Sequence, residues 1–120
     1  MAVPKRRILN RPEQALQLQV AKYLDLALPN DAVWFHVPNA AKRGVVAGAM
    51  NKRLGVKAGV PDIAIIHTGA VYFIELKAPG GKASEAQDDM IHQLAEAGAH
   101  CAVLSSLDLV IGALKMWRLV

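Results

Sequence analysis

The sequence has little cysteine and few aromatic residues. Its 120 residues include a single cysteine, Cys101, and aromatic residues make up only 5% of the chain. One cysteine excludes a disulfide bond within the chain, and no group of cysteines and histidines has the spacing of a structural zinc site. The core must therefore be built from aliphatic side chains. A hydrophobic content of 53% is enough for one folded domain of this length.

The sequence also lacks a long hydrophobic run. Its first ten residues, MAVPKRRILN, have no apolar centre of the kind that a signal peptide needs. The longest segment without Asp, Glu, Lys or Arg extends from Ile63 to Ile74 and contains a histidine, whereas a helix that spans a bilayer needs about 20 apolar residues. We therefore expect a cytoplasmic, intracellular protein that does not bind membranes.

Acidic residues are missing between Asp31 and Asp62. The same segment contains five basic residues, namely Lys42, Arg43, Lys52, Arg53 and Lys57. The formal net charge of the whole chain is +4. A basic segment without acids is a candidate surface for nucleic-acid phosphates. A basic face that merely contacts solvent is an equally good interpretation of the charges alone.

Hydrophobic periodicity and turn residues divide the chain into alternating helices and strands. The residues before Pro12 are expected to form a loose basic arm over positions 1–10, because proline favours the first turn of a helix. The remaining residues, 11–120, are expected to form one domain. We predict helices from Pro12 to just before Pro29, over 45–54 and 85–97, and from Ser106 or Asp108 to about Met116. We predict strands over 32–37, 62–67, 71–76 and 101–105, and a strand or a tail at 117–120.

This order of elements predicts an α/β fold with a mixed central sheet flanked by helices. The residues TGA at 68–70 indicate a hairpin between the second and third strands. The third strand is then followed by a helix and another strand, which predicts a β–α–β crossover. The apolar C-terminal residues Leu114, Met116, Trp117 and Leu119 could complete the core or form an interface with another chain, and the core is the interpretation we favour.

Three charged residues stand at the ends of two apolar strands. Asp62 begins the strand after Pro61, and Glu75 and Lys77 end the next strand. In an antiparallel hairpin, the start of the first strand lies beside the end of the second. We therefore expect Asp62 and Glu75 to meet at one edge of the sheet. Because side chains alternate along a strand, Glu75 and Lys77 should project from the same face.

Two neighbouring carboxylates repel each other unless a cation lies between them. Mg²⁺ is suitable, because it accepts a few carboxylate or carbonyl oxygens and keeps several waters. Lys77 could orient a water molecule for the metal-assisted hydrolysis of a phosphate ester. Isolated charges at strand ends are nevertheless common, so an Asp, a Glu and a Lys in this spacing are a weak signal when taken alone.

Asp62 followed by Glu75-Leu76-Lys77 resembles the PD-(D/E)XK nuclease pattern, and the fold that this implies is restriction-endonuclease-like. More narrowly, the chain resembles a stand-alone VRR-Nuc domain, the virus-type replication and repair nuclease. The matching segments cover most of the chain in the order of the family: PEQALQLQVAKYL at 12–24, HVPN at 36–39, AGVPD at 58–62, FIELKAPGGKASEAQ at 73–87 and LAEAGAHCAVLSS at 94–106.

The resemblance implies roles for particular residues. Asp62, Glu75 and the backbone carbonyl of Leu76 would hold Mg²⁺ or Mn²⁺, and Lys77 would act on the attacking water. Glu13 would be a further acid that supports the metal, although an acid is also common in the first turn of a helix.

Two amide side chains also match the family. Gln87 would position the site or the DNA, although it could be a plain amide on a helix surface. Asn39 would contact DNA, although after Pro38 it could simply be a turn residue. We give Gln17 no separate role, and we favour a partly buried strand histidine over a metal ligand for His36.

The function implied is that of a Mg²⁺- or Mn²⁺-dependent DNA endonuclease in a bacterial or phage-infected cell, with no small-molecule cofactor beyond the metal. Small stand-alone relatives of this kind are associated with homodimers that cut branched DNA such as four-way junctions. The DNA-binding residues would be Asn39, Lys42, Arg43, Lys52, Arg53 and Lys57. Two alternatives are a non-catalytic nucleic-acid-binding module of the same fold and a restriction-type nuclease specific for duplex DNA.

Overall fold

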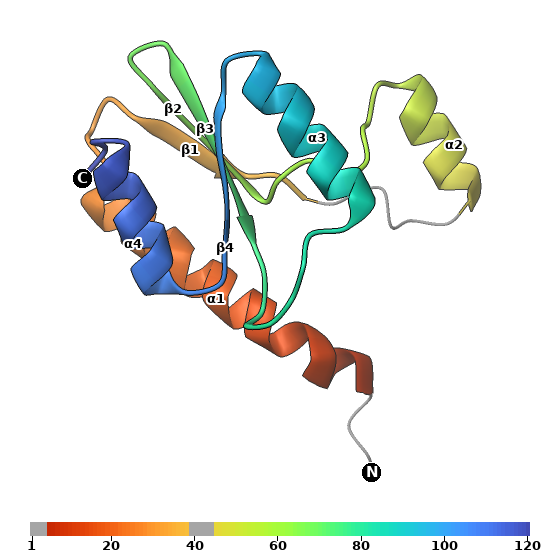
Figure 1. Cartoon of the computed structure of the whole chain (residues 1–120). Coiled ribbons are helices and arrows are strands. Elements are labelled where there is room, and N and C mark those ends of the chain that lie inside the picture. The colour runs from red at the N-terminus through yellow and green to blue at the C-terminus, as the bar shows by residue number, and fades with distance from the viewer. Residues whose placement is uncertain (1–4, 39–44) are drawn as a thin grey trace.

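The structure of the protein is a computed structural model. It describes the backbone over residues 5–38 and 45–120 and the side chains over residues 12–38 and 48–120. The elements run in the order α1 (Lys5–Ala27), β1 (Val33–His36), α2 (Val45–Arg53), β2 (Ile63–His67), β3 (Ala70–Leu76), α3 (Glu85–Glu96), β4 (His100–Leu104) and α4 (Leu107–Met116) (Figure 1).

The strands form one sheet in the order β1-β2-β3-β4. The β1–β2 and β2–β3 pairs are antiparallel, whereas β3 and β4 are parallel and joined by α3. The predicted mixed α/β fold and its β–α–β crossover are therefore confirmed. Thr68 and Gly69 connect β2 and β3 with φ values of 48° and 83°, and positive φ at both central residues is the requirement of a tight type I′ hairpin turn.

Helix α1 begins earlier than the sequence predicted. It starts at Lys5 and continues through Pro12, which lies in its interior. The prediction treated Pro12 as the first helical residue because that position needs no backbone N–H. An interior proline disfavours a helix, because it removes one backbone hydrogen bond and crowds the carbonyl group four residues earlier, yet here the helix continues on both sides of Pro12. The expected loose arm is thus helical over residues 5–10, and residues 1–4 lie outside the described part.

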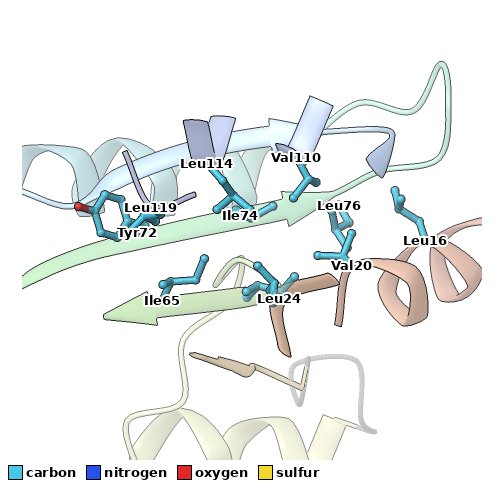
Figure 2. Packing of buried hydrophobic residues seen from close by; sticks show 11 residues of the cluster. Leu16, Val20, Leu24, Ile65, Tyr72, Ile74, Leu76, Val110, Leu114 and Leu119 are labelled. Carbon is cyan, nitrogen blue, oxygen red and sulfur yellow. The ribbon is translucent and has the colours of Figure 1, made fainter. Parts of the chain in front are cut away.

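One face of the sheet carries the core. The buried side chains come from α1, β2, β3, α4 and the segment after α4, and Figure 2 shows their packing. Helix α1 contributes Leu16, Val20 and Leu24, which recur every four residues and so lie on one side of the helix. They face Ile63, Ile65, Tyr72, Ile74 and Leu76 of the strands, with Val110 and Leu114 of α4 and Leu119 behind them.

The C-terminal residues divide between the core and the surface. Leu114 and Leu119 are buried, and Trp117 packs against the core while it caps the end of α4. Met116 is 80% exposed. The favoured interpretation of this region as core is therefore confirmed for most of its apolar residues. The segment after α4 is not a strand.

Different helices pack on the two faces of the sheet. Helices α1 and α4 lie on the core face, α3 lies on the other side, and α2 stands apart from the sheet (Figure 1). Side chains along β3 alternate between the faces, so Ile74 and Leu76 enter the core while Glu75 points to the side of α3. None of the described helices is both long and apolar enough to cross a membrane.

We predict that Leu24→Ala lowers the free energy of unfolding by about 2–5 kcal/mol, because it removes a fully buried side chain and leaves a cavity. Leu26 lies on the same helix and is 79% exposed, so Leu26→Ala is the matched control and should change stability little. Urea denaturation of both variants measures the difference. Equal losses in the two variants would contradict the burial of α1 described above.

Candidate active site

The β2–β3 hairpin brings Asp62 beside the end of β3. Ile63 pairs with Ile74, so the residues just beyond this pair, Asp62 and Glu75, are neighbours across the two strands. The backbone N–H of Leu76 donates to Oδ2 of Asp62 over 2.8 Å. This hydrogen bond joins the Asp62 carboxylate to β3 and fixes its direction at the end of the hairpin.

Strand β1 holds the same residue from the other side. The backbone N–H of Val37 donates to the carbonyl oxygen of Asp62 over 2.7 Å. The ring nitrogen Nδ1 of His36 lies 2.8 Å from the same oxygen. Because a carbonyl oxygen can only accept, the proton of this bond must be on Nδ1. Asp62 is therefore fixed both through its backbone and through its side chain.

Glu75 is a buried carboxylate with two donors. Its exposed fraction is only 3%. Its Oε2 atom lies 3.3 Å from Nζ of Lys77, which projects from the same face of β3 as predicted. The side-chain nitrogen Nε2 of Gln87 donates to the same oxygen over 2.8 Å. Asp62, Glu75, Lys77 and Gln87, which the sequence separates by up to 25 positions, therefore meet at one place.

The orientation of the Gln87 amide follows from its two partners. Gln87 is the third residue of α3, and Ser84 caps that helix. The backbone N–H of Ser84 donates to Oε1 of Gln87 over 2.8 Å, and Oγ of Ser84 accepts from the Gln87 backbone N–H over 3.2 Å. This reciprocal capping box occupies the amide oxygen. The amide nitrogen is consequently directed at Glu75, which accepts the bond.

These residues line a cavity of about 370 Å³. One wall is the N-terminal half of α1, and the rest comes from the ends of the strands and from the start of α3. The lining residues are Glu13, Gln14, Gln17, Leu18, His36, Asp62, Glu75, Leu76, Lys77 and Gln87. The cavity is open to solvent at the end of the sheet, so a phosphate group of a larger molecule could enter it.

Burial raises the pKa of both carboxyl groups, so that they lose their protons less readily than in water. It raises the pKa of Asp62, and the hydrogen bond from Leu76 only partly offsets this effect. Burial and the neighbouring charge of Asp62 together raise the pKa of Glu75 to about 7, although Lys77 acts in the opposite direction. Glu13 contributes a small further rise at Asp62. A cation between the two carboxylates would relieve this repulsion.

The donor set suits a hard divalent cation of the Mg²⁺ type. Two carboxylates and a neighbouring backbone carbonyl are typical of Mg²⁺ sites in which waters and substrate phosphates complete the coordination. Among the residues that the structure describes, no group of three or more His, Cys, Asp or Glu side chains is arranged to hold a metal. Glu13 therefore lines the cavity without joining the two carboxylates in a ready-made three-acid site.

The comparisons with known proteins identify the family. The model of the VRR-NUC domain matches residues 6–108. This chain belongs to the VRR-NUC family. The resemblance noted in the sequence is thus confirmed, and so is the restriction-endonuclease-like, PD-(D/E)XK fold class that it implied. Family membership gives the chain a nuclease-type function on nucleic acid, with DNA as the implied substrate.

Two solved structures are similar to this VRR-NUC chain. One, described as a VRR_NUC domain protein, has 29% sequence identity and a TM-score of 0.68, and the match covers 86% of this chain and 84% of that one. The other, described as a VRR_NUC domain, has 16% identity and a TM-score of 0.61, with 87% of this chain and 95% of that one covered, so it bears on the fold alone. No curated protein matches the chain.

Of the predicted DNA-binding residues of this VRR-NUC domain, the structure describes three. Asn39, Lys42 and Arg43 are outside the described residues. Lys52 and Arg53 are exposed in the last turn of α2, and Lys57 is exposed in the loop that follows. None of these three lines the cavity.

Sequence reasoning assigned no functional role to four residues of the cavity wall, although it considered Gln17 and His36. Gln14, Gln17 and Leu18 follow Glu13 on α1, and their helical spacing was the available signal, because residues three and four positions apart share a face. Leu18 is 68% exposed and lines the cavity. His36 was expected to be a partly buried strand histidine, whereas it is exposed and lines the cavity.

We predict that, without divalent cations, the protein loses stability as the pH rises from about 4.5 to about 7. Glu75 binds its proton more tightly in the folded chain (pKa about 7) than in the unfolded chain (4.5), so the folded state is favoured below this range and the advantage is gone above it. This difference between the two pKa values corresponds to a loss of roughly 3 kcal/mol in the free energy of unfolding across the range. Thermal unfolding of wild-type protein and of Glu75→Gln, both in chelator, measures it.

The glutamine variant removes the titrating group, so its stability should change less than that of the wild type over this range. An identical pH dependence of the two melting temperatures would show that Glu75 is not the group responsible.

Proposed function

We propose that this protein is a divalent-metal-dependent DNA endonuclease that hydrolyses phosphodiester bonds, prefers branched DNA such as four-way junctions, and acts as a homodimer. The observation that carries the proposal is the meeting of Asp62, Glu75 and Lys77 at the end of the β2–β3 hairpin, on the wall of one open cavity. The family assignment makes phosphodiesters the relevant substrate.

Asp62, Glu75 and the carbonyl oxygen of Leu76 would hold Mg²⁺ or Mn²⁺. The cation held by these residues would neutralise the two carboxylates and would supply Lewis acidity to the phosphate and to the attacking water. The raised pKa values of both carboxylates support this assignment, because two acids buried together need such a counter-ion. Glu13 lies on the opposite wall and would bind a water molecule of the same site rather than the cation itself.

The ammonium group of Lys77 lies 3.3 Å from Oε2 of Glu75. Its ammonium group would hold the attacking water near the phosphorus atom and stabilise the charge that develops on the phosphate oxygens. Gln87 would keep the Glu75 carboxylate in one orientation through its Nε2 bond, so that the other carboxylate oxygen faces the cavity.

Basic residues outside the cavity would bind the DNA backbone. Lys52, Arg53 and Lys57 belong to α2 and the loop after it, on a part of the molecule that stands apart from the sheet (Figure 1). No long insert between the described elements offers side chains for reading base edges, which supports recognition by shape and charge over sequence recognition. A twofold dimer would place two such sites on the two strands of a symmetric junction.

We predict that Asp62→Asn, Glu75→Gln and Lys77→Ala each abolish cleavage while the protein still folds and binds DNA. Loss of a residue that only supports a metal ligand typically costs about 10–100-fold in activity, so removal of a ligand should cost ~100-fold or more. The assay uses end-labelled four-way junction, flap, single-stranded and duplex DNA with Mg²⁺, with Mn²⁺ and with chelator. Paired, metal-dependent cuts in opposite strands of the junction are the expected result.

Asp89→Asn is the matched control, since Asp89 is an exposed acid on α3 outside the cavity, and it should cut at the wild-type rate. Wild-type cleavage by any of the three site variants would reject that residue's role. Binding without cutting of every substrate would instead favour a non-catalytic module, and cuts at one duplex sequence would favour a restriction-type nuclease.

We predict that the double variant Lys52→Ala/Arg53→Ala binds DNA more weakly and with a flatter salt dependence. Each lost phosphate contact should reduce the slope of log K against log salt by about 0.9 for duplex DNA. Fluorescence anisotropy with junction DNA at several salt concentrations measures the slope. Lys115→Ala is the control because this exposed lysine lies on α4, away from α2 (Figure 1). An unchanged slope in the double variant would reject α2 as a DNA-binding surface.

A further inference from the structure

Gly59 brings the backbone of the loop before β2 close to the backbone of helix α3. Its φ is +79°, and a Cβ atom built on it would collide with the carbonyl group of Ala86 and would lie 2.8 Å from the backbone nitrogen of Gln87. These atoms are backbone atoms of the first turn of α3, so they cannot move aside as a flexible side chain could. Any residue with a side chain at position 59 would therefore displace the start of α3 or the loop.

That first turn carries the donor that holds Glu75. The Gln87 amide is fixed at one end by the Ser84 N–H and at the other by Oε2 of Glu75, each over 2.8 Å. Both bonds are short and leave little room for movement, since a hydrogen bond weakens steeply when its geometry is lost. A shift of the turn by a fraction of an ångström would loosen the bond to Glu75.

We propose that Gly59 is a positioning residue of the active site. Because position 59 has no side chain, the loop can pack directly against the first turn of α3. This contact fixes the position of Gln87 relative to Glu75, and thereby the orientation of the Glu75 carboxylate. This inference rests on the proposed nuclease function for its kinetic consequence. Its geometric content, the contact of Gly59 with α3 and the placement of the Gln87 amide, is independent of that function.

The alternative reason for a glycine here is its backbone conformation alone, because positive φ is strained for other residues. The chain offers a matched control for this alternative. Gly55 lies in the same loop with a φ of +98°, and a Cβ there would meet nothing within 4 Å. Gly55→Ala therefore introduces a similar backbone strain without any collision, and only Gly59→Ala should affect the site.

The experiment compares wild-type protein with Gly59→Ala, Gly55→Ala, Gln87→Ala and the double variant Gly59→Ala/Gln87→Ala in junction cleavage under Mg²⁺. We expect Gly59→Ala to lower kcat on the order of 100-fold, as a misplacement of about 1 Å can do, with KM for DNA unchanged, and Gly55→Ala to cut at the wild-type rate. Because Gly59 acts through Gln87, the double variant should be no slower than the slower single variant.

Nuclear magnetic resonance supplies readouts that do not depend on cleavage. In the wild-type protein, a nuclear Overhauser effect between a Gly59 Hα proton and the Gln87 backbone amide proton is expected. In Gly59→Ala, but not in Gly55→Ala, the side-chain amide signals of Gln87 should move toward the positions of a solvent-exposed glutamine.

Equal rates for the two glycine variants, or fully additive losses in the double variant, would overturn the proposal. So would the absence of the Gly59–Gln87 contact in the wild type, a test that remains valid even if Gly59→Ala does not fold. If wild-type protein cuts no substrate, the proposed function fails, while the wild-type contact and the Gln87 signals still decide whether Gly59 positions this amide.

Discussion

Burial of the Glu75 carboxylate is the constraint on which the rest of this site depends. A carboxylate that is nearly inaccessible to water is stable only if other groups replace its hydration. Here Lys77 and Gln87 both contact its Oε2 atom. The lysine comes from the same strand, but the glutamine comes from another element, so α3 must start at a defined place relative to the end of β3. The helix cap at Ser84 and the close contact at Gly59 both act on that start.

The core on the opposite face of the sheet determines the other wall of the cavity. Leu16, Val20 and Leu24 bury one side of α1 against the strands. Glu13 lies one turn before Leu16, so the packing that anchors the helix also brings this acid to the cavity. The proposed chemistry thus uses side chains on α1 and α3, with Asp62 just before β2 and Glu75 near the end of β3. Such support by helices and strands holds a site more firmly than loops would.

Local patterns were sufficient to predict the elements and the central pair of acids. The hairpin followed from TGA between two apolar strands, and the period of two in β3 placed Glu75 and Lys77 on one face. The start of α3 was also predictable, because serine favours the position just before a helix. The contact between Gly59 and Ala86 was not, because it joins residues that only the packing of α3 brings together. The start of α1 was missed because proline favours a first turn without excluding earlier turns.

The proposed function assigns the binding of DNA and the chemistry to different parts of the molecule. A cavity of about 370 Å³ can take a phosphate and a few waters but not a length of duplex, so most of a DNA substrate must lie outside it. The exposed basic residues of α2 lie apart from the sheet and line no part of the cavity. Loop 54–62 connects them directly to Asp62, and within it Gly59 rests on α3. This loop therefore links the proposed DNA-binding segment to both carboxylates. It reaches Asp62 directly along the chain, and it reaches Glu75 through Gln87 of α3, at a contact that leaves no room for a side chain on Gly59.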